Sequence, residues 1–130
     1  MYVSKNHRTK VFIKEGNIVL FLNQPEDYLS AIGDLPKNIV FSSESEGSLD
    51  FIQVFVKNKA ELEAQLPKLK KKMSYDGKLW VSYYKGTSKN KTDINRDNLR
   101  KYAQSTGLKT VAMISINKDW SAMRLKITDS

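Results

Sequence analysis

Few side chains in this sequence could do chemistry. Its 130 residues include one histidine, His7, and no cysteine, so a metal site built from several such ligands is excluded. A serine–histidine–aspartate triad would have to use the same histidine, which lies in a polar segment near the N-terminus. Asp93 and Asp97 stand at a predicted helix start, where capping explains them better than acid–base catalysis. The sequence therefore indicates no catalytic residue and no metal site, and it favours a protein that is not an enzyme.

Basic charge is concentrated in the second half of the chain. The net charge at pH 7 is +8, and residues 67–130 hold 15 Lys and Arg against 5 Asp and Glu. Residues 1–66 hold 7 Lys and Arg against 9 Asp and Glu. Clustered cations attract nucleic acid and other anions. A solvated lysine surface that keeps a protein soluble has the same composition, so charge alone leaves both interpretations open.

The composition is that of an ordinary globular protein. Apolar residues make up 40% of the chain and charged residues 28%, which argues against a disordered or fibrous protein. The N-terminus lacks the apolar stretch of a signal peptide, and no apolar run is long enough to span a membrane. We expect one cytoplasmic domain over residues 1–130, in which residues 1–9 form a flexible or loosely packed segment.

The elements that must position a site are predicted to alternate between strands and helices. The apolar run 18–22 has the length and composition of a strand buried on both faces, which is typical of parallel sheets. A short connection joins the last two strands and predicts an antiparallel hairpin. We expect strands at residues 18–22, 39–41, 51–56, 79–84, 110–116 and 123–127, and helices at residues 26–32, 59–73 and from Asn95 to a stop at Gly107.

The predicted fold class is therefore α/β, with a mostly parallel open sheet flanked by helices and an antiparallel hairpin at its end. Asn58 followed by Glu61 predicts the N-cap of the second helix. Pro67 should kink this helix, unless two shorter helices stand there instead. Tyr75-Asp76-Gly77 is predicted to be a turn that precedes the strand 79–84.

Ligands of open α/β sheets bind outside the carboxyl ends of the strands, and several side chains are predicted to lie there. Basic residues after the strand 79–84 could bind a phosphate or another anion, with a solvated loop as the alternative. Aromatic residues could offer a stacking surface, with packing in the core as the alternative. The candidate residues for this edge are Asn23, Gln24, Ser82, Tyr84, Lys85, Lys89, Lys91, Arg96 and Trp120.

The order of elements resembles that of the class I S-adenosylmethionine-dependent methyltransferases. The resemblance rests on the opening strand, the helix that leads into Asp76-Gly77 and the next strand, and the closing hairpin. It implies a Rossmann-like, doubly wound sheet whose final strand is inserted antiparallel beside its neighbour. In that family the cofactor lies on a glycine-rich turn after the first strand, and an acidic residue after the second strand binds the ribose.

This sequence departs from the cofactor pattern of the methyltransferases. The turn after the first strand reads Leu22-Asn23-Gln24-Pro25-Glu26 and has no glycine, and the acidic position could only be Glu44. We therefore expect a truncated methyltransferase-like domain that does not use S-adenosylmethionine.

A second resemblance covers about residues 9–128 and is more specific. The segments that carry it are Leu20-Phe21-Leu22-Asn23-Gln24-Pro25, Ala60-Glu61-Leu62-Glu63, Gly77-Lys78-Leu79-Trp80-Val81-Ser82-Tyr83, Thr92-Asp93-Ile94-Asn95-Arg96-Asp97 and Asp119-Trp120-Ser121-Ala122. In this order they are similar to a bacterial family of small proteins known only as a domain of unknown function. The resemblance strengthens the expected fold and implies no activity.

Three hypotheses on function follow from these observations. The first is a non-catalytic domain that binds a small molecule, such as a small anion, or a protein partner at the carboxyl edge of the sheet. The second is a weak nucleic-acid or anion-binding module that uses the basic second half. The third is a diverged small-molecule transferase, which binding of S-adenosylmethionine would reveal.

Overall fold

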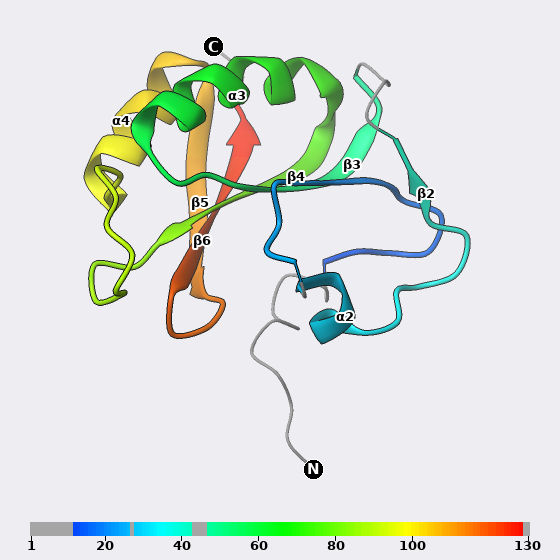
Figure 1. Ribbon diagram of the computed structural model, residues 1–130. Coiled ribbons are helices and arrows are strands. Elements are labelled where there is room, and N and C mark those ends of the chain that lie inside the picture. Colours follow the sequence, from blue (N-terminus) through cyan, green and yellow to red (C-terminus); the bar gives the residue numbers. More distant parts are fainter. Residues whose placement is uncertain (1–11, 27, 43–46, 129–130) are drawn as a thin grey trace.

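A single sheet of six strands forms the centre of the molecule (Figure 1). The computed structural model describes residues 12–26, 28–42 and 47–128. The strands lie in the order β2-β1-β3-β4-β6-β5. Their bounds are β1 Ile18–Leu22, β2 Val40–Phe41, β3 Leu49–Phe55, β4 Met73–Tyr84, β5 Leu108–Ser115 and β6 Trp120–Ile127.

The strand directions confirm the predicted mixed sheet. Strands β2, β1, β3 and β4 are parallel to one another, whereas β6 runs antiparallel to both β4 and β5. Strand β6 is thus inserted between β4 and β5, as the resemblance to methyltransferases implied. The open α/β class and the Rossmann-like arrangement are both confirmed.

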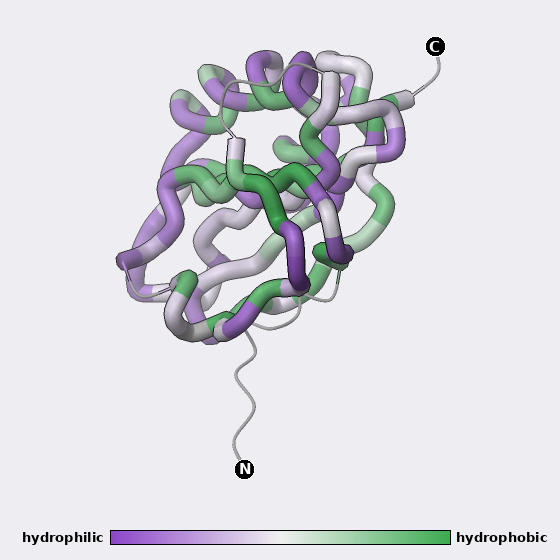
Figure 2. The backbone as a smooth tube through the Cα atoms, turned by 90° about the vertical axis from the view of Figure 1, so that its right-hand side faces the viewer, coloured by the Kyte–Doolittle hydropathy of each residue, from purple (hydrophilic) through white to green (hydrophobic). Residues whose placement is uncertain are grey.

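Helices cover the two faces of the sheet unequally. Helices α3 (Lys59–Lys72) and α4 (Arg96–Ser105) lie on one face, and the short helix α2 (Tyr28–Ile32) lies on the other (Figure 1). Each face has its own apolar cluster, because alternate residues of β3 and β4 point to opposite sides. Figure 2 shows hydrophobic stretches through the interior and hydrophilic residues along the outer helices.

Helix α3 begins as the sequence predicts. The Asn58 side chain accepts a hydrogen bond from the backbone N–H of Glu61 at 2.9 Å, and the Glu61 carboxylate accepts one from the N–H of Lys57 at 3.0 Å. The helix runs without a break through Pro67, so the alternative of two shorter helices is wrong. The apolar stripe of the helix packs on the sheet, and this packing stabilises a single helix despite the proline.

The predicted turn at Tyr75-Asp76-Gly77 is wrong, because these residues belong to β4. Met73 pairs with Leu49 and Lys78 pairs with Phe51, so residues 74–77 bulge out opposite Asp50. The Asp-Gly pair signals a local change of chain direction, and here that change is a bulge within a strand. The pairing with β3 therefore overrides the local turn signal.

The boundaries of the final hairpin also differ from the prediction. The side-chain oxygen of Asn117 accepts hydrogen bonds from the N–H groups of Asp119 and Trp120, at 2.9 and 3.0 Å. These bonds close a tight turn, and β6 begins at Trp120 rather than at the predicted Met123. Strand β5 begins earlier than predicted, at Leu108, because Gly107 turns the chain with a φ of 82° directly after α4.

Candidate functional site

Two cavities open at the carboxyl end of β4, and both are lined by Tyr84. The larger has a volume of about 540 Å³ and lies between the start of α3 and the connection from β4 to α4. We call it the Tyr84 cavity; its lining residues are Lys57, Asn58, Tyr84, Asn90, Lys91, Thr92 and Asp93. Its volume falls within the range of small-molecule sites, and its place is the one where open α/β sheets hold ligands.

The connection between β4 and α4 is held in place by hydrogen bonds to the final hairpin. The hydroxyl of Ser88, which is buried, donates to the Asp119 carboxylate at 2.9 Å. The Ser88 oxygen also accepts from the N–H of Asn90 at 3.1 Å, and the N–H of Lys85 donates to the carbonyl of Asp119 at 2.8 Å. These hydrogen bonds therefore attach the connection, which forms one wall of the Tyr84 cavity, to the final hairpin.

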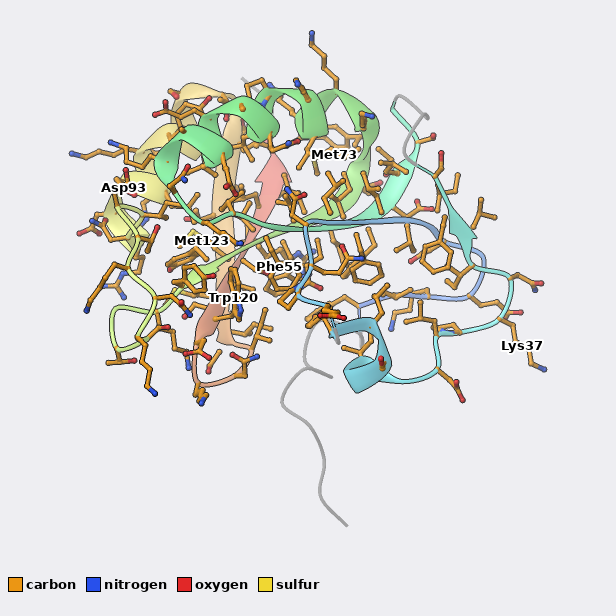
Figure 3. All side chains as sticks on the ribbon, viewed as in Figure 1. Lys37, Phe55, Met73, Asp93, Trp120 and Met123 are labelled. Atoms are coloured by element: carbon orange, nitrogen blue, oxygen red, sulfur yellow. The ribbon has the colours of Figure 1, made fainter. Side chains whose placement is uncertain are left out.

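Asp93 joins the starts of two helices beside this cavity (Figure 3). Its carboxylate accepts a hydrogen bond from the N–H of Lys59 at 2.7 Å, at the start of α3. Its carbonyl accepts one from the side chain of Asn98 at 2.8 Å, and Asn98 and Asn95 cap α4 reciprocally. The Asp93 carboxylate therefore caps α3, whereas the sequence predicted a capping role at the start of α4, which Asn95 caps instead. The carboxylate keeps its negative charge, so the Tyr84 cavity is lined by two lysines and one aspartate.

Of the predicted basic residues, Lys91 lines the Tyr84 cavity, whereas Lys85 and Arg96 line the smaller one of about 330 Å³. The ammonium group of Lys85 donates to the hydroxyl of Ser115, which ties β4 to the end of β5. Burial raises the pKa of the Tyr83 phenol in this region, and the nearby Arg96 guanidinium opposes that rise. Lys89 is exposed in the connection and lines neither cavity.

Ser82 lies inside the sheet and not at the surface of the site. It is fully buried, and its hydroxyl accepts a hydrogen bond from the Gln53 amide at 3.2 Å. The Gln53 carbonyl in turn accepts from the phenol of Tyr28 at 2.9 Å. These three side chains connect β4, β3 and α2 within an otherwise apolar layer, so the contacts of Ser82 are structural.

Replacing Ser82 with alanine is expected to lower the free energy of unfolding by about 1–2 kcal/mol, because the buried hydrogen bond between the Gln53 amide and the Ser82 hydroxyl is lost. Urea unfolding measures this change. Ser30→Ala, at an exposed position of α2, is the control and should change stability by less than about 0.5 kcal/mol. Equal stability of Ser82→Ala and the original protein would contradict the structural role.

Trp120 belongs to the core, which was the predicted alternative to a stacking surface for the aromatic residues. Only 7% of its surface is exposed, and its ring lies 4.2 Å from that of Tyr84 and 5.0 Å from that of Phe55. Figure 3 shows Phe55 and Trp120 together on the side of the sheet that α2 covers. Tyr84, which is half-buried, is thus the aromatic residue that the cavity exposes, with Trp120 packed against it.

The turn after β1 lies apart from these residues. Gln24 lines a separate cavity of about 290 Å³, together with Leu29 and Phe41. Asn23 adopts a φ of 59°, a left-handed conformation that asparagine tolerates better than most residues. The structure therefore does not bring Asn23 and Gln24 together with Tyr84 and Lys91. Glu44 and His7 lie outside the described residues.

Sequence reasoning missed Lys57, Asn90 and Thr92 as lining residues of the Tyr84 cavity. Lys57 follows β3 almost directly, so the rule that ligands bind beyond strand ends could have found it. Asn90 and Thr92 lie in a long connection, and nothing in their spacing shows which way that connection folds. Among the described residues, no group of three His, Cys, Asp or Glu side chains could hold a metal.

The fold defines a class: the chain has the Rossmann-like fold of the S-adenosylmethionine-dependent methyltransferases. A methyltransferase of this kind from Aquifex aeolicus superposes with a TM-score of 0.63 at 15% identity, over 93% of this chain and 88% of that one. Sp1610 of Streptococcus pneumoniae, a putative tRNA (m1A22) methyltransferase, gives 0.61 at 12% identity over 100% and 72%. Identities this low establish a common fold alone.

The chain belongs to the family described as protein of unknown function DUF3052, whose model matches residues 11–129. This confirms the resemblance to a family without a known function. Curated protein sequences include no significant match. Within the part of the chain that the structure describes, no helix is long and apolar enough to cross a membrane.

Proposed function

We propose that this protein binds a small anionic molecule with a planar ring in the Tyr84 cavity and does not transform it. The observation that carries the proposal is the combination of Lys57, Lys91 and Tyr84 around one cavity of about 540 Å³ at the carboxyl end of the parallel strands. The location fits the general rule for ligands of open α/β sheets. We further propose that the protein works in the cytoplasm, which its lack of cysteine permits.

The lining residues support an anionic, ring-bearing ligand. The ammonium groups of Lys57 and Lys91 can bind phosphate or carboxylate oxygens, and the Tyr84 ring offers an aromatic surface. Asn90 adds an amide that can contact the polar edge of a ring. A nucleoside monophosphate has both of these chemical features and is a suitable test compound.

S-adenosylmethionine is not the ligand that we propose. A ligand that lies on the turn after the first strand needs bare backbone with free N–H groups. Here Pro25 has no N–H, and its carbonyl accepts a hydrogen bond from the N–H of Tyr28 at 3.0 Å. The side chains of Gln24 and Leu29 occupy the walls of the adjoining cavity. These features support a methyltransferase-like domain that has no methyl donor.

Thermal unfolding with AMP, inorganic phosphate and S-adenosylmethionine tests the proposal. AMP is expected to raise the melting temperature, because a ligand present at about 100 times its Kd stabilises the folded state by about 2.7 kcal/mol. The double variant Lys57→Gln/Lys91→Gln should lose this shift. Lys118→Gln, in the turn between β5 and β6, removes one charge outside the cavity and should keep it.

Two outcomes would overturn the proposal. One is an AMP shift that the double variant retains, which would place the ligand elsewhere. The other is stabilisation by S-adenosylmethionine and not by AMP, which would support the transferase hypothesis instead. A turnover assay for methyl transfer and phosphate release accompanies the measurement, and activity lost in the double variant would show that the site is catalytic.

A further inference from the structure

Two lysines face each other at the opposite end of the sheet from the Tyr84 cavity. Lys109 of β5 and Lys126 of β6 are direct partners in the antiparallel register, and both side chains are exposed. Directly opposed residues of such strands have Cβ atoms about 5 Å apart, so like charges at these positions destabilise the sheet. No helix end accounts for this pair. An anionic partner would remove the repulsion.

The lysine pair borders a cavity of about 300 Å³ that also contains an aromatic residue. Tyr75, Ile127 and Thr128 complete its lining, and 51% of the Tyr75 surface is exposed. A half-exposed aromatic ring beside two ammonium groups is the arrangement with which proteins hold single-stranded nucleic acid, because bases stack on the ring while lysines bind the phosphates.

The basic end of α3 lies near the same end of the sheet. Lys70, Lys71 and Lys72 form the last turn of the helix, and an added Cβ at Gly107 would collide with the Lys70 ammonium group. The Gly107 carbonyl accepts hydrogen bonds from the N–H and the hydroxyl of Thr128, at 3.1 and 3.0 Å. Lys109 and Lys126 are on the other face of the sheet from α3, because the neighbouring pair Leu108 and Ile127 packs against the cluster under α3 and α4.

We call the group Tyr75, Lys109 and Lys126 the lysine surface. The segments that build it, residues 75–76, 107–109 and 126–128, contain one acidic residue, Asp76. The helix dipole explains the lysines at the end of α3, but it does not explain the opposed pair on the strands. The net positive charge of the second half of the chain is therefore gathered in part on a surface far from the predicted ligand edge.

We propose that the lysine surface binds single-stranded nucleic acid, with phosphates on Lys109 and Lys126 and a base stacked on Tyr75. This proposal is independent of the small-molecule site at the carboxyl end, because no residue lines both cavities. It also differs from the nucleic-acid hypothesis based on Lys85, Lys89, Lys91 and Arg96, which lie beyond the other end of β4.

The decisive variant is Lys126→Glu, because it reverses one charge of the proposed site and also removes the repulsion between the two paired lysines in the sheet. It replaces the like-charge pair by an opposite-charge pair, so the melting temperature should stay the same or rise. Fluorescence anisotropy with a labelled oligothymidylate of about 16 nucleotides at low salt should show binding weakened about tenfold. The slope of log K against log salt should become less steep by about 1.

Two further variants complete the experiment. Lys89→Glu makes the same charge change in the connection between β4 and α4 and should keep the affinity within about twofold. Tyr75→Ala should weaken binding about fivefold or more, because a stacked base contributes about 1–3 kcal/mol.

Three results would overturn the proposal. The first is no binding of the oligonucleotide at low salt. The second is equal weakening by Lys126→Glu and Lys89→Glu, which would mean that diffuse charge and not this surface attracts the strand. The third is competition by an oligoglutamate peptide that is as effective as unlabelled oligonucleotide, which would point to an acidic protein partner.

Discussion

Replacement of Trp120 by alanine is expected to lower the free energy of unfolding by about 3–5 kcal/mol, the usual cost of emptying a large buried aromatic site. The indole is only 7% exposed and contacts the rings of both Tyr84 and Phe55. The loss should be visible as a lower midpoint of urea unfolding. It would establish that Trp120 is a core residue.

Trp120→Phe is the matched control for this prediction. A phenyl ring can keep the edge-to-face contact with Phe55, so the loss should be clearly smaller than for alanine. If Trp120→Ala unfolded at nearly the same urea concentration as the original protein, the residue would not be a core residue. Trp120 would then again be a candidate for stacking on a ligand.

Gly77→Ala is expected to cost about 2–3 kcal/mol, because the new methyl group meets backbone that cannot move aside. A Cβ at this position would lie 2.7 Å from the carbonyl oxygen of Leu49 and 3.0 Å from that of Ser74. Both oxygens belong to the bulge in β4 or to its partner strand β3. Urea unfolding followed by circular dichroism measures the change.

Gly86→Ala is the control, since a Cβ there would meet no atom within 4 Å. Its effect should stay within about 0.5 kcal/mol, or be slightly stabilising because the unfolded chain loses freedom. A Gly77→Ala protein as stable as this control would show that the bulge at residues 74–77 is not closely packed.

The fold could be predicted because its signals are local and strong. The apolar run of β1 has no polar interruption, and Asn58 and Asn95 are clear helix caps. The short connection before β6 indicated the antiparallel hairpin. Each of these features depends on residues that are close together in the sequence.

The details that were missed depend on pairing between distant segments. Residues 75–77 look like a turn until β3 is placed beside them, and the register with Leu49 and Phe51 then makes them a bulge. Gln53 lies within an apolar run, and only its contacts with Tyr28 and Ser82 show that a polar network crosses the core. No spacing in the sequence indicates either arrangement.

The sequence predicted only some residues of the candidate site, because the others join it through contacts between distant segments. Tyr84 follows from the rule about strand ends, and the same rule could have found Lys57, whereas Lys91 joins them only because the connection from β4 folds toward the start of α3. The hydrogen bond between Asp93 and Lys59 fixes that approach. Lys109 and Lys126 are 17 residues apart in the sequence and become neighbours only through the register of β5 and β6.

The most direct test of ligand binding in the Tyr84 cavity is an NMR titration of the isotope-labelled protein, first with AMP and separately with S-adenosylmethionine. We predict that AMP shifts the amide signals of Lys57, Asn58, Tyr84 and residues 90–92, which line the cavity. We predict no shift at Asn23 and Gln24 with S-adenosylmethionine. Unchanged signals around Tyr84 with AMP, or shifts at Asn23 and Gln24 with S-adenosylmethionine, would contradict the proposed site.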